Sequence, residues 1–84
     1  MNEIKINVLL FGACRETAGA GELNFRLNAP ANVASAWSEI KRQYPDLGRF
    51  ERSALFAVNE EHARIDQPLE DGDTLAVFPP VSGG

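Results

Sequence analysis

The chain lacks several features that would assign it to common classes of protein. Its single cysteine, Cys14, cannot form an internal disulfide, and such sparing use of cysteine is typical of a reducing compartment. No apolar run approaches the roughly 18 residues that cross a bilayer. The N-terminus has neither the basic start nor the long apolar segment of a signal peptide. These absences predict a cytoplasmic protein that does not insert into a membrane.

Basic residues and metal ligands are also scarce. The 8 Lys and Arg residues are outnumbered by 12 Asp and Glu, which gives a net charge of −4, and they form no cluster. A nucleic-acid-binding domain would carry a basic patch, so no nucleic-acid partner is expected. His62 is the only histidine, with no second ligand at a suitable spacing. No metal site is therefore expected, and His62 is assigned to a surface strand position.

The hydrophobic pattern predicts a single α+β domain with one main helix. Residues 33–44 carry apolar side chains at helical spacing, between the candidate N-cap Asn32 and the helix-ending Pro45. Residues 12–21 are interpreted as a loop, and the stretch around Leu47 and Phe50 as irregular. Strands are expected at residues 4–11, 22–27, 54–58, 62–65 and 74–78.

A single helix can cover only one face of a sheet. A β-grasp (ubiquitin-like) roll meets this constraint, with a mixed sheet of four to five strands and the first and last strands paired in parallel at its centre. Other α+β rolls satisfy the pattern as well. The β-grasp domain is expected to span residues 1–78, and residues 79–84 to form an extended tail.

Alternation along the first and last strands places Leu9, Phe11 and Phe78 on the face that the helix leaves uncovered. Large apolar side chains that share an exposed face often mark an interaction site. The alternative is that the loop at residues 12–21, or the stretch around Leu47 and Phe50, folds over them. The pattern alone leaves both interpretations open.

The last six residues have an unusual composition. Pro79 and Pro80 cannot continue a ladder of hydrogen bonds and favour an extended backbone. Gly83 and Gly84 make the thinnest possible peptide, which can thread a narrow channel. This order predicts a carboxylate held away from the domain, whereas the ordinary alternative is a frayed end without a role.

Five segments of the chain carry a recognisable pattern: residues 10–16 with Gly19, the helix end at Tyr44 and Pro45, and residues 57–59, 65–73 and 76–84. Together they resemble the small subunits of molybdopterin synthases, which are ubiquitin-like sulfur carriers. The resemblance covers nearly the whole chain and is most specific in the last third. Thiazole-synthesis carriers and ubiquitin-related modifiers share the fold and the Gly-Gly end. The thiazole carriers lack a Phe-x-x-x-Arg-Glu segment like that of residues 11–16.

The resemblance implies a chemistry centred on Gly84. An E1-like activating enzyme would adenylate this carboxylate with ATP, and sulfur would then replace AMP to give a thiocarboxylate. The large subunit of the synthase would take up the tail and transfer the sulfur to cyclic pyranopterin monophosphate, forming the molybdopterin dithiolene. The expected complex is a 2+2 heterotetramer, in which this chain is not itself an enzyme and has no catalytic residue and no permanently bound cofactor. The tail residues that would enter the partner are Pro79, Pro80, Val81, Ser82, Gly83 and Gly84.

Alternation and the resemblance together assign partner contacts to Leu9, Phe11 and Phe78. The resemblance itself supports Phe11 and Phe78 and, to a lesser extent, His62. Three other functions stay open: a sulfur carrier for thiazole synthesis, a protein modifier joined to lysines through Gly84, and an interaction domain with an inert tail. A persulfide on Cys14 is rejected, although Arg15 could lower its thiol pKa, because no histidine is near in the sequence. Arg15 and Glu16 are interpreted as either a loop-fixing ion pair or contacts to the activating enzyme.

Overall fold

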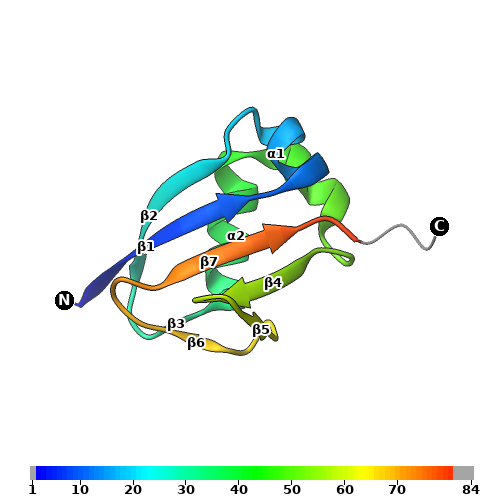
Figure 1. The fold of residues 1–84 in the computed structure, drawn as a ribbon. Helices are drawn as coiled ribbons and strands as arrows, with labels where there is room; N and C mark the ends of the chain where they lie inside the picture. The colour runs from blue at the N-terminus through cyan, green and yellow to red at the C-terminus, as the bar shows by residue number, and fades with distance from the viewer. Residues whose placement is uncertain (1, 81–84) are drawn as a thin grey trace.

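A five-stranded sheet forms one layer of the molecule, and the main helix crosses one of its faces (Figure 1). The computed structural model describes residues 2–80. The strand order is β2-β1-β7-β4-β5, and a separate two-stranded sheet pairs β3 with β6. In chain order the elements are β1 (Glu3–Leu10), α1 (Gly12–Ala18), β2 (Glu22–Asn28), β3 (Ala31–Asn32), α2 (Val33–Gln43), the 3₁₀ helix η1 (Pro45–Phe50), β4 (Leu55–Val58), β5 (Glu61–Ala63), β6 (Pro68–Leu69) and β7 (Thr74–Phe78).

The predicted β-grasp architecture is confirmed. β1 and β7 are parallel neighbours at the centre of the sheet, with Val8 beside Leu75 and Leu10 beside Val77. β2 and β4 flank this pair in antiparallel orientation. The side chains that alternation assigned to the covered face are buried beneath α2 and form the core with the helix stripe. The largest fully buried side chains are Ile6, Leu10, Ile40, Leu47 and Leu75.

The main helix begins where the sequence predicts it. The Asn32 side chain accepts a hydrogen bond from the Ser35 backbone N–H at 2.8 Å, and Ser35 Oγ accepts one from the Asn32 backbone N–H at 2.8 Å. This reciprocal capping box satisfies two backbone donors that the first helical turn leaves free. Further along the helix, Trp37 and Ile40 are buried in the core.

We expect Asn32→Ala to lower the free energy of unfolding by about 1 kcal/mol, because the first turn of α2 loses its cap. Urea denaturation followed by circular dichroism would measure the change. Ser38→Ala is the matched control, because Ser38 lies exposed in the middle of the same helix. A loss for Asn32→Ala no larger than that for Ser38→Ala would show that the cap contributes nothing.

The loop interpretation of residues 12–21 is wrong, because residues 12–18 form the helix α1. Gly12, at φ +54°, turns the chain out of β1, and Cys14 packs into the core with no exposed surface. Gly19 closes the helix in the left-handed conformation, where its N–H donates to the Arg15 carbonyl at 2.9 Å. A helix of 7 residues has too few turns to leave a clear periodic pattern.

Three smaller differences from the sequence-based expectations concern short elements. The stretch around Leu47 and Phe50 is the 3₁₀ helix η1, and Leu47 is fully buried. The strand expected at residues 62–65 is β5, and it covers Glu61–Ala63 instead. β3 and β6 have 2 residues each, which is too short for an alternating pattern. Among residues 2–80, no helix has the length and apolar character needed to cross a bilayer.

Candidate interaction face and C-terminal tail

The face of the sheet opposite α2, here called the open face, is built from aligned rows of side chains. Residues paired across neighbouring strands point to the same side. The strand registers therefore align Leu9, Ala76, Ala57 and His62 in one row across four strands. His62 is exposed on β5, which confirms its predicted surface strand position.

A second row holds the aromatic side chains. Phe11 and Phe78 stack with their ring centroids 4.8 Å apart and their planes 9° apart. Leu55 lies opposite Phe78 in the register, so it extends this row onto β4. Phe11 and Leu55 are each 40% exposed, so this row presents contiguous apolar surface of the kind that marks interaction sites. We call Leu9, Phe11, Leu55 and Phe78 the apolar patch.

Leu55 was not among the residues predicted for this face. Its position could have been found from alternation, because the neighbouring Phe56 and Val58 are buried on the covered face. The missing information was which strand lies beside β7. The pairing of β4 with β7 joins residues that are distant in the chain, such as Leu55 and Phe78, so the local sequence does not specify it.

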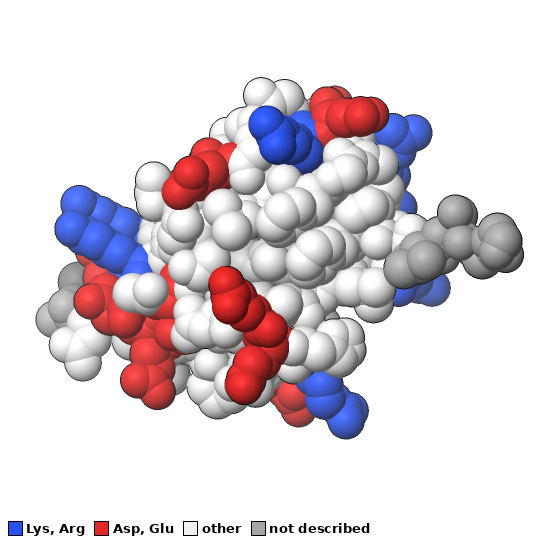
Figure 2. Space-filling view, viewed as in Figure 1, with Lys and Arg blue, Asp and Glu red and all other residues white. Residues whose placement is uncertain are grey.

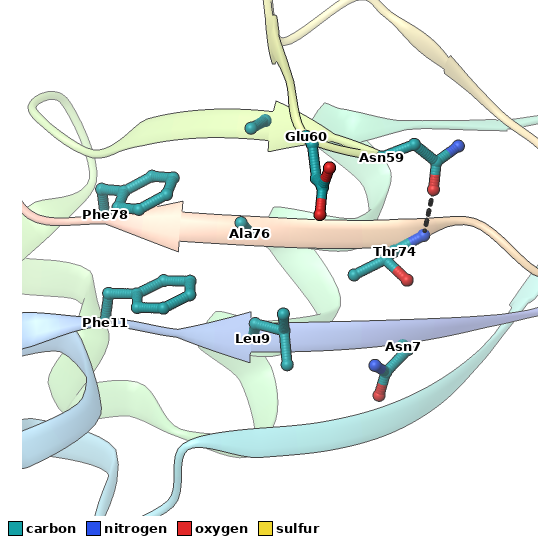
Figure 3. A pocket seen from close by; sticks show the side chains of 9 residues that line it. Asn7, Leu9, Phe11, Asn59, Glu60, Thr74, Ala76 and Phe78 are labelled. Atoms are coloured by element: carbon teal, nitrogen blue, oxygen red, sulfur yellow. Dashed lines mark hydrogen bonds between the residues drawn. The ribbon is translucent and has the colours of Figure 1, made fainter.

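A shallow depression of about 720 Å³ lies between the two rows and the β4–β5 turn (Figure 3). The small side chains of Ala57 and Ala76 form its floor, and the two phenylalanines form one end. The interpretation that α1 or η1 folds over this face is wrong, because Leu47 is buried in the core and Phe11 stays exposed. The depression is lined by Asn7, Leu9, Phe11, Ala57, Asn59, Glu60, Thr74, Ala76 and Phe78.

The other end of the depression is polar. Asn59 and Glu60 form the β4–β5 turn with positive φ angles of 50° and 72°. The Asn59 Oδ1 accepts a hydrogen bond from the Thr74 N–H at 2.9 Å, and its Nδ2 donates one to Asp73 at 2.9 Å. Asn7 Oδ1 is buried without a hydrogen-bond partner among residues 2–80. The depression therefore combines an apolar end with a polar end of fixed geometry.

The C-terminal segment leaves the sheet beside the aromatic row. The Phe11 N–H donates to the Val77 carbonyl at 3.1 Å, which continues the β1–β7 pairing to the end of both strands. Pro79 then lies against the start of α1, where a Cβ on Gly12 would come within 3.1 Å of its Cγ. Pro80 is exposed. Val81, Ser82, Gly83 and Gly84 lie outside the described residues, so the predictions that concern them stay predictions.

The remaining candidates, Cys14, Arg15 and Glu16, lie in α1, and Arg15 borders a second depression together with Leu9 and Phe11. Arg15 lies next to Gly21, where an added Cβ would be 2.9 Å from its Nε. Within the part of the chain that the structure describes, neither Arg15 nor Glu16 belongs to an ion pair, so the loop-fixing pair is not formed. Burial raises the pKa of the Cys14 thiol, the opposite of what its neighbour Arg15 suggested. Cys14 therefore has the character of a core residue.

We expect iodoacetamide to modify Cys14 at least about tenfold more slowly in the native protein than in urea, because the thiolate is both inaccessible and disfavoured. Intact-mass spectrometry over time would give both rates. A free glutathione sample reacted in parallel in buffer and in urea corrects for the effect of the denaturant. Equal rates after that correction would place the thiol at the surface.

Comparisons with known proteins find relatives with the same fold and a family match that extends to residue 84. Residues 8–84 match the ThiS family. The molybdopterin synthase sulfur carrier subunit of Chlamydomonas reinhardtii is 36% identical over 83 residues, which cover 96% of this chain and 100% of that protein. The SAMP1 structure from Haloferax volcanii superimposes with a TM-score of 0.86 at 28% identity, covering 95% of this chain and 99% of its own.

One structural relative was solved as an assembly. It is the complex of subunits 1 and 2 of the molybdopterin-converting factor from Helicobacter pylori. Its matching chain has a TM-score of 0.63 and 27% identity, covering 96% of this chain and 100% of its own.

Proposed function

Because the chain belongs to the ThiS family, we propose that it is the sulfur-carrier subunit of a molybdopterin synthase, acting in the cytoplasm. The observation that carries the proposal is similarity over nearly the full length to molybdopterin synthase sulfur carrier subunits. The fold adds a second support, because its apolar patch lies beside the point where β7 leads into the C-terminal segment. A carrier needs such a surface to present its terminus to a partner.

The proposed chemistry takes place on the Gly84 carboxylate. A carboxylate is a poor electrophile, so an E1-like enzyme first converts it with ATP into an acyl adenylate. Sulfur then replaces AMP and leaves a thiocarboxylate, which donates its sulfur to cyclic pyranopterin monophosphate. Two loaded carriers supply the two sulfurs of each molybdopterin dithiolene. The catalytic groups belong to the partners, and this chain contributes the sulfur and its delivery.

The proposed partner on the open face is the large subunit of the synthase. The Helicobacter pylori complex supports a two-protein assembly. We propose that Leu9, Phe11 and Phe78 pack against the large subunit while residues 79–84 enter its active site. Burying the tail there also excludes water from the thiocarboxylate. A 2+2 heterotetramer is the proposed stoichiometry.

A protein modifier is the second candidate function. SAMP1 is a small archaeal modifier protein by name, and it is 28% identical to this chain over most of its length. A modifier would pass through the same adenylate but end as an isopeptide with a lysine of a target protein. The fold and the tail suit both functions, so the product formed on Gly84 distinguishes them.

The test is to incubate the purified chain with its activating enzyme, ATP and a sulfur donor, and to measure its intact mass. A sulfur carrier exchanges one oxygen of the terminal carboxylate for sulfur. Adding the large subunit and cyclic pyranopterin monophosphate should then restore the original mass and yield molybdopterin. Isopeptide-linked proteins in place of the thiocarboxylate would show that the chain is a protein modifier. An unchanged mass would favour an interaction domain with an inert tail.

A further inference from the structure

The β4–β5 turn beside the open face holds the backbone of one charged residue, Glu60, in a defined conformation. We propose that Glu60 pairs with an Arg or Lys side chain of the protein that docks on the open face, and that this pair orients the docked protein. The inference rests on the proposed function, in which the docked protein is the synthase large subunit. It assigns Glu60 a specificity-determining role.

The backbone places Glu60 in a conformation that few side chains adopt. Val58 pairs with Glu61 in the β4–β5 hairpin, so Asn59 and Glu60 form a two-residue turn. Both have positive φ, and glycine is the residue favoured at the second position of such turns. A glutamate at φ 72° is strained relative to glycine. Strain of this kind in a folded protein often accompanies a functional position.

The turn is held against the sheet from one side. Asn59 bonds to the Thr74 backbone N–H and to the Asp73 side chain, both at 2.9 Å, so the turn is tied to the start of β7. Figure 3 shows the Glu60 side chain reaching from the turn over β7, between Ala76 and Thr74. The carboxylate therefore lies over the floor of the depression, although Glu60 itself is exposed in the isolated chain.

Its own chain gives this carboxylate no partner. Within residues 2–80, Glu60 takes part in no ion pair and no side-chain hydrogen bond. The residues that share the depression with it are uncharged. The cations that border this face include Lys5 and Arg26, which pair in the register between β1 and β2 beyond the polar end of the depression, and Arg15, which lies near Leu9 and Phe11. None of these three lines the depression with Glu60. In Figure 2, acidic side chains lie next to an uncharged central area of this face.

When a protein docks on the open face, the lack of an opposite charge beside the Glu60 carboxylate affects the binding free energy. A protein that packs on the apolar patch also excludes water from the Glu60 carboxylate. A carboxylate that loses water without gaining an opposite charge opposes binding, whereas a close interfacial charge pair favours it and fixes the register of the two surfaces. The partner that fits this face therefore presents an apolar surface with a cation at one side.

The test compares two isosteric charge removals in neighbouring residues. Glu60→Gln keeps the size and backbone preference of the residue at the depression. Glu61→Gln removes the same charge one position later, where the register with the buried Val58 directs the side chain to the other face. Both variants and the unaltered chain would be titrated calorimetrically with the purified large subunit at low and high salt.

We expect Glu60→Gln to bind about tenfold more weakly than the unaltered chain at low salt, with a smaller salt dependence. Glu61→Gln should stay within about twofold, as is usual for an exposed charge outside the contact. Equal or tighter binding by Glu60→Gln overturns the inference, and so does an equal loss in both variants, which would indicate general charge attraction. If the unaltered chain does not bind the large subunit, the proposed function itself fails.

Discussion

Replacing Phe78 with alanine is expected to weaken binding of the synthase large subunit by about 2 kcal/mol, or roughly 30-fold. Phe78 is the central side chain of the aromatic row, stacked on Phe11 at 4.8 Å and opposite Leu55. Its removal takes away its own contact area and leaves the Phe11 ring without its neighbour. Isothermal titration calorimetry with purified large subunit measures the change directly.

Ile65→Ala provides the matched control for this experiment. Ile65 is 59% exposed, and its carbonyl accepts a hydrogen bond from Ala34 in α2, so it lies outside the open face. The Ile65→Ala change removes exposed apolar surface outside the apolar patch. The affinity of this variant for the large subunit should stay near that of the unaltered chain. Thermal melting of both variants would show whether either change destabilises the fold. If a folded Phe78→Ala variant binds the large subunit with unchanged affinity, the apolar patch does not contribute to the interface.

Deleting Gly84 is expected to lower the rate of sulfur transfer at least about 100-fold. The new terminus at Gly83 is still a glycine carboxylate, but it ends about 3.5 Å short. Misplacing a reacting group by even 1 Å can cost about 100-fold in rate. Intact-mass spectrometry measures the loading step, in which the thiocarboxylate forms. The yield of molybdopterin measures the transfer step separately.

Ser82→Ala is the control for the deletion, because it changes the same segment while keeping its length and both glycines. It should be loaded with sulfur at nearly the rate of the unaltered chain. A deletion variant that is loaded and transfers sulfur normally would show that Gly84 is dispensable. The inert-tail interpretation would then replace the sulfur-carrier proposal.

The sequence by itself determined the elements that repeat a pattern over many residues. The alternation in β1 and β7 separated Val8 and Leu75 from Leu9 and Phe78 before any pairing was known. The apolar stripe and the Asn32 cap located α2. These features follow from local periodicity and local hydrogen bonding, which a single segment contains. The composition of residues 79–84 likewise predicted a thin, extended tail without any knowledge of the fold, and the family resemblance implied the chemistry proposed for it.

The tertiary structure decided everything that depends on neighbours distant in the chain. It folded residues 12–18 into α1, because Cys14 is buried against the core. It placed Leu55 beside Phe78, and it tied the Asn59 turn to Thr74 so that Glu60 stands over the open face. Such contacts are set by strand order and by the packing of short segments, where local propensity is weak and the rest of the molecule determines the outcome.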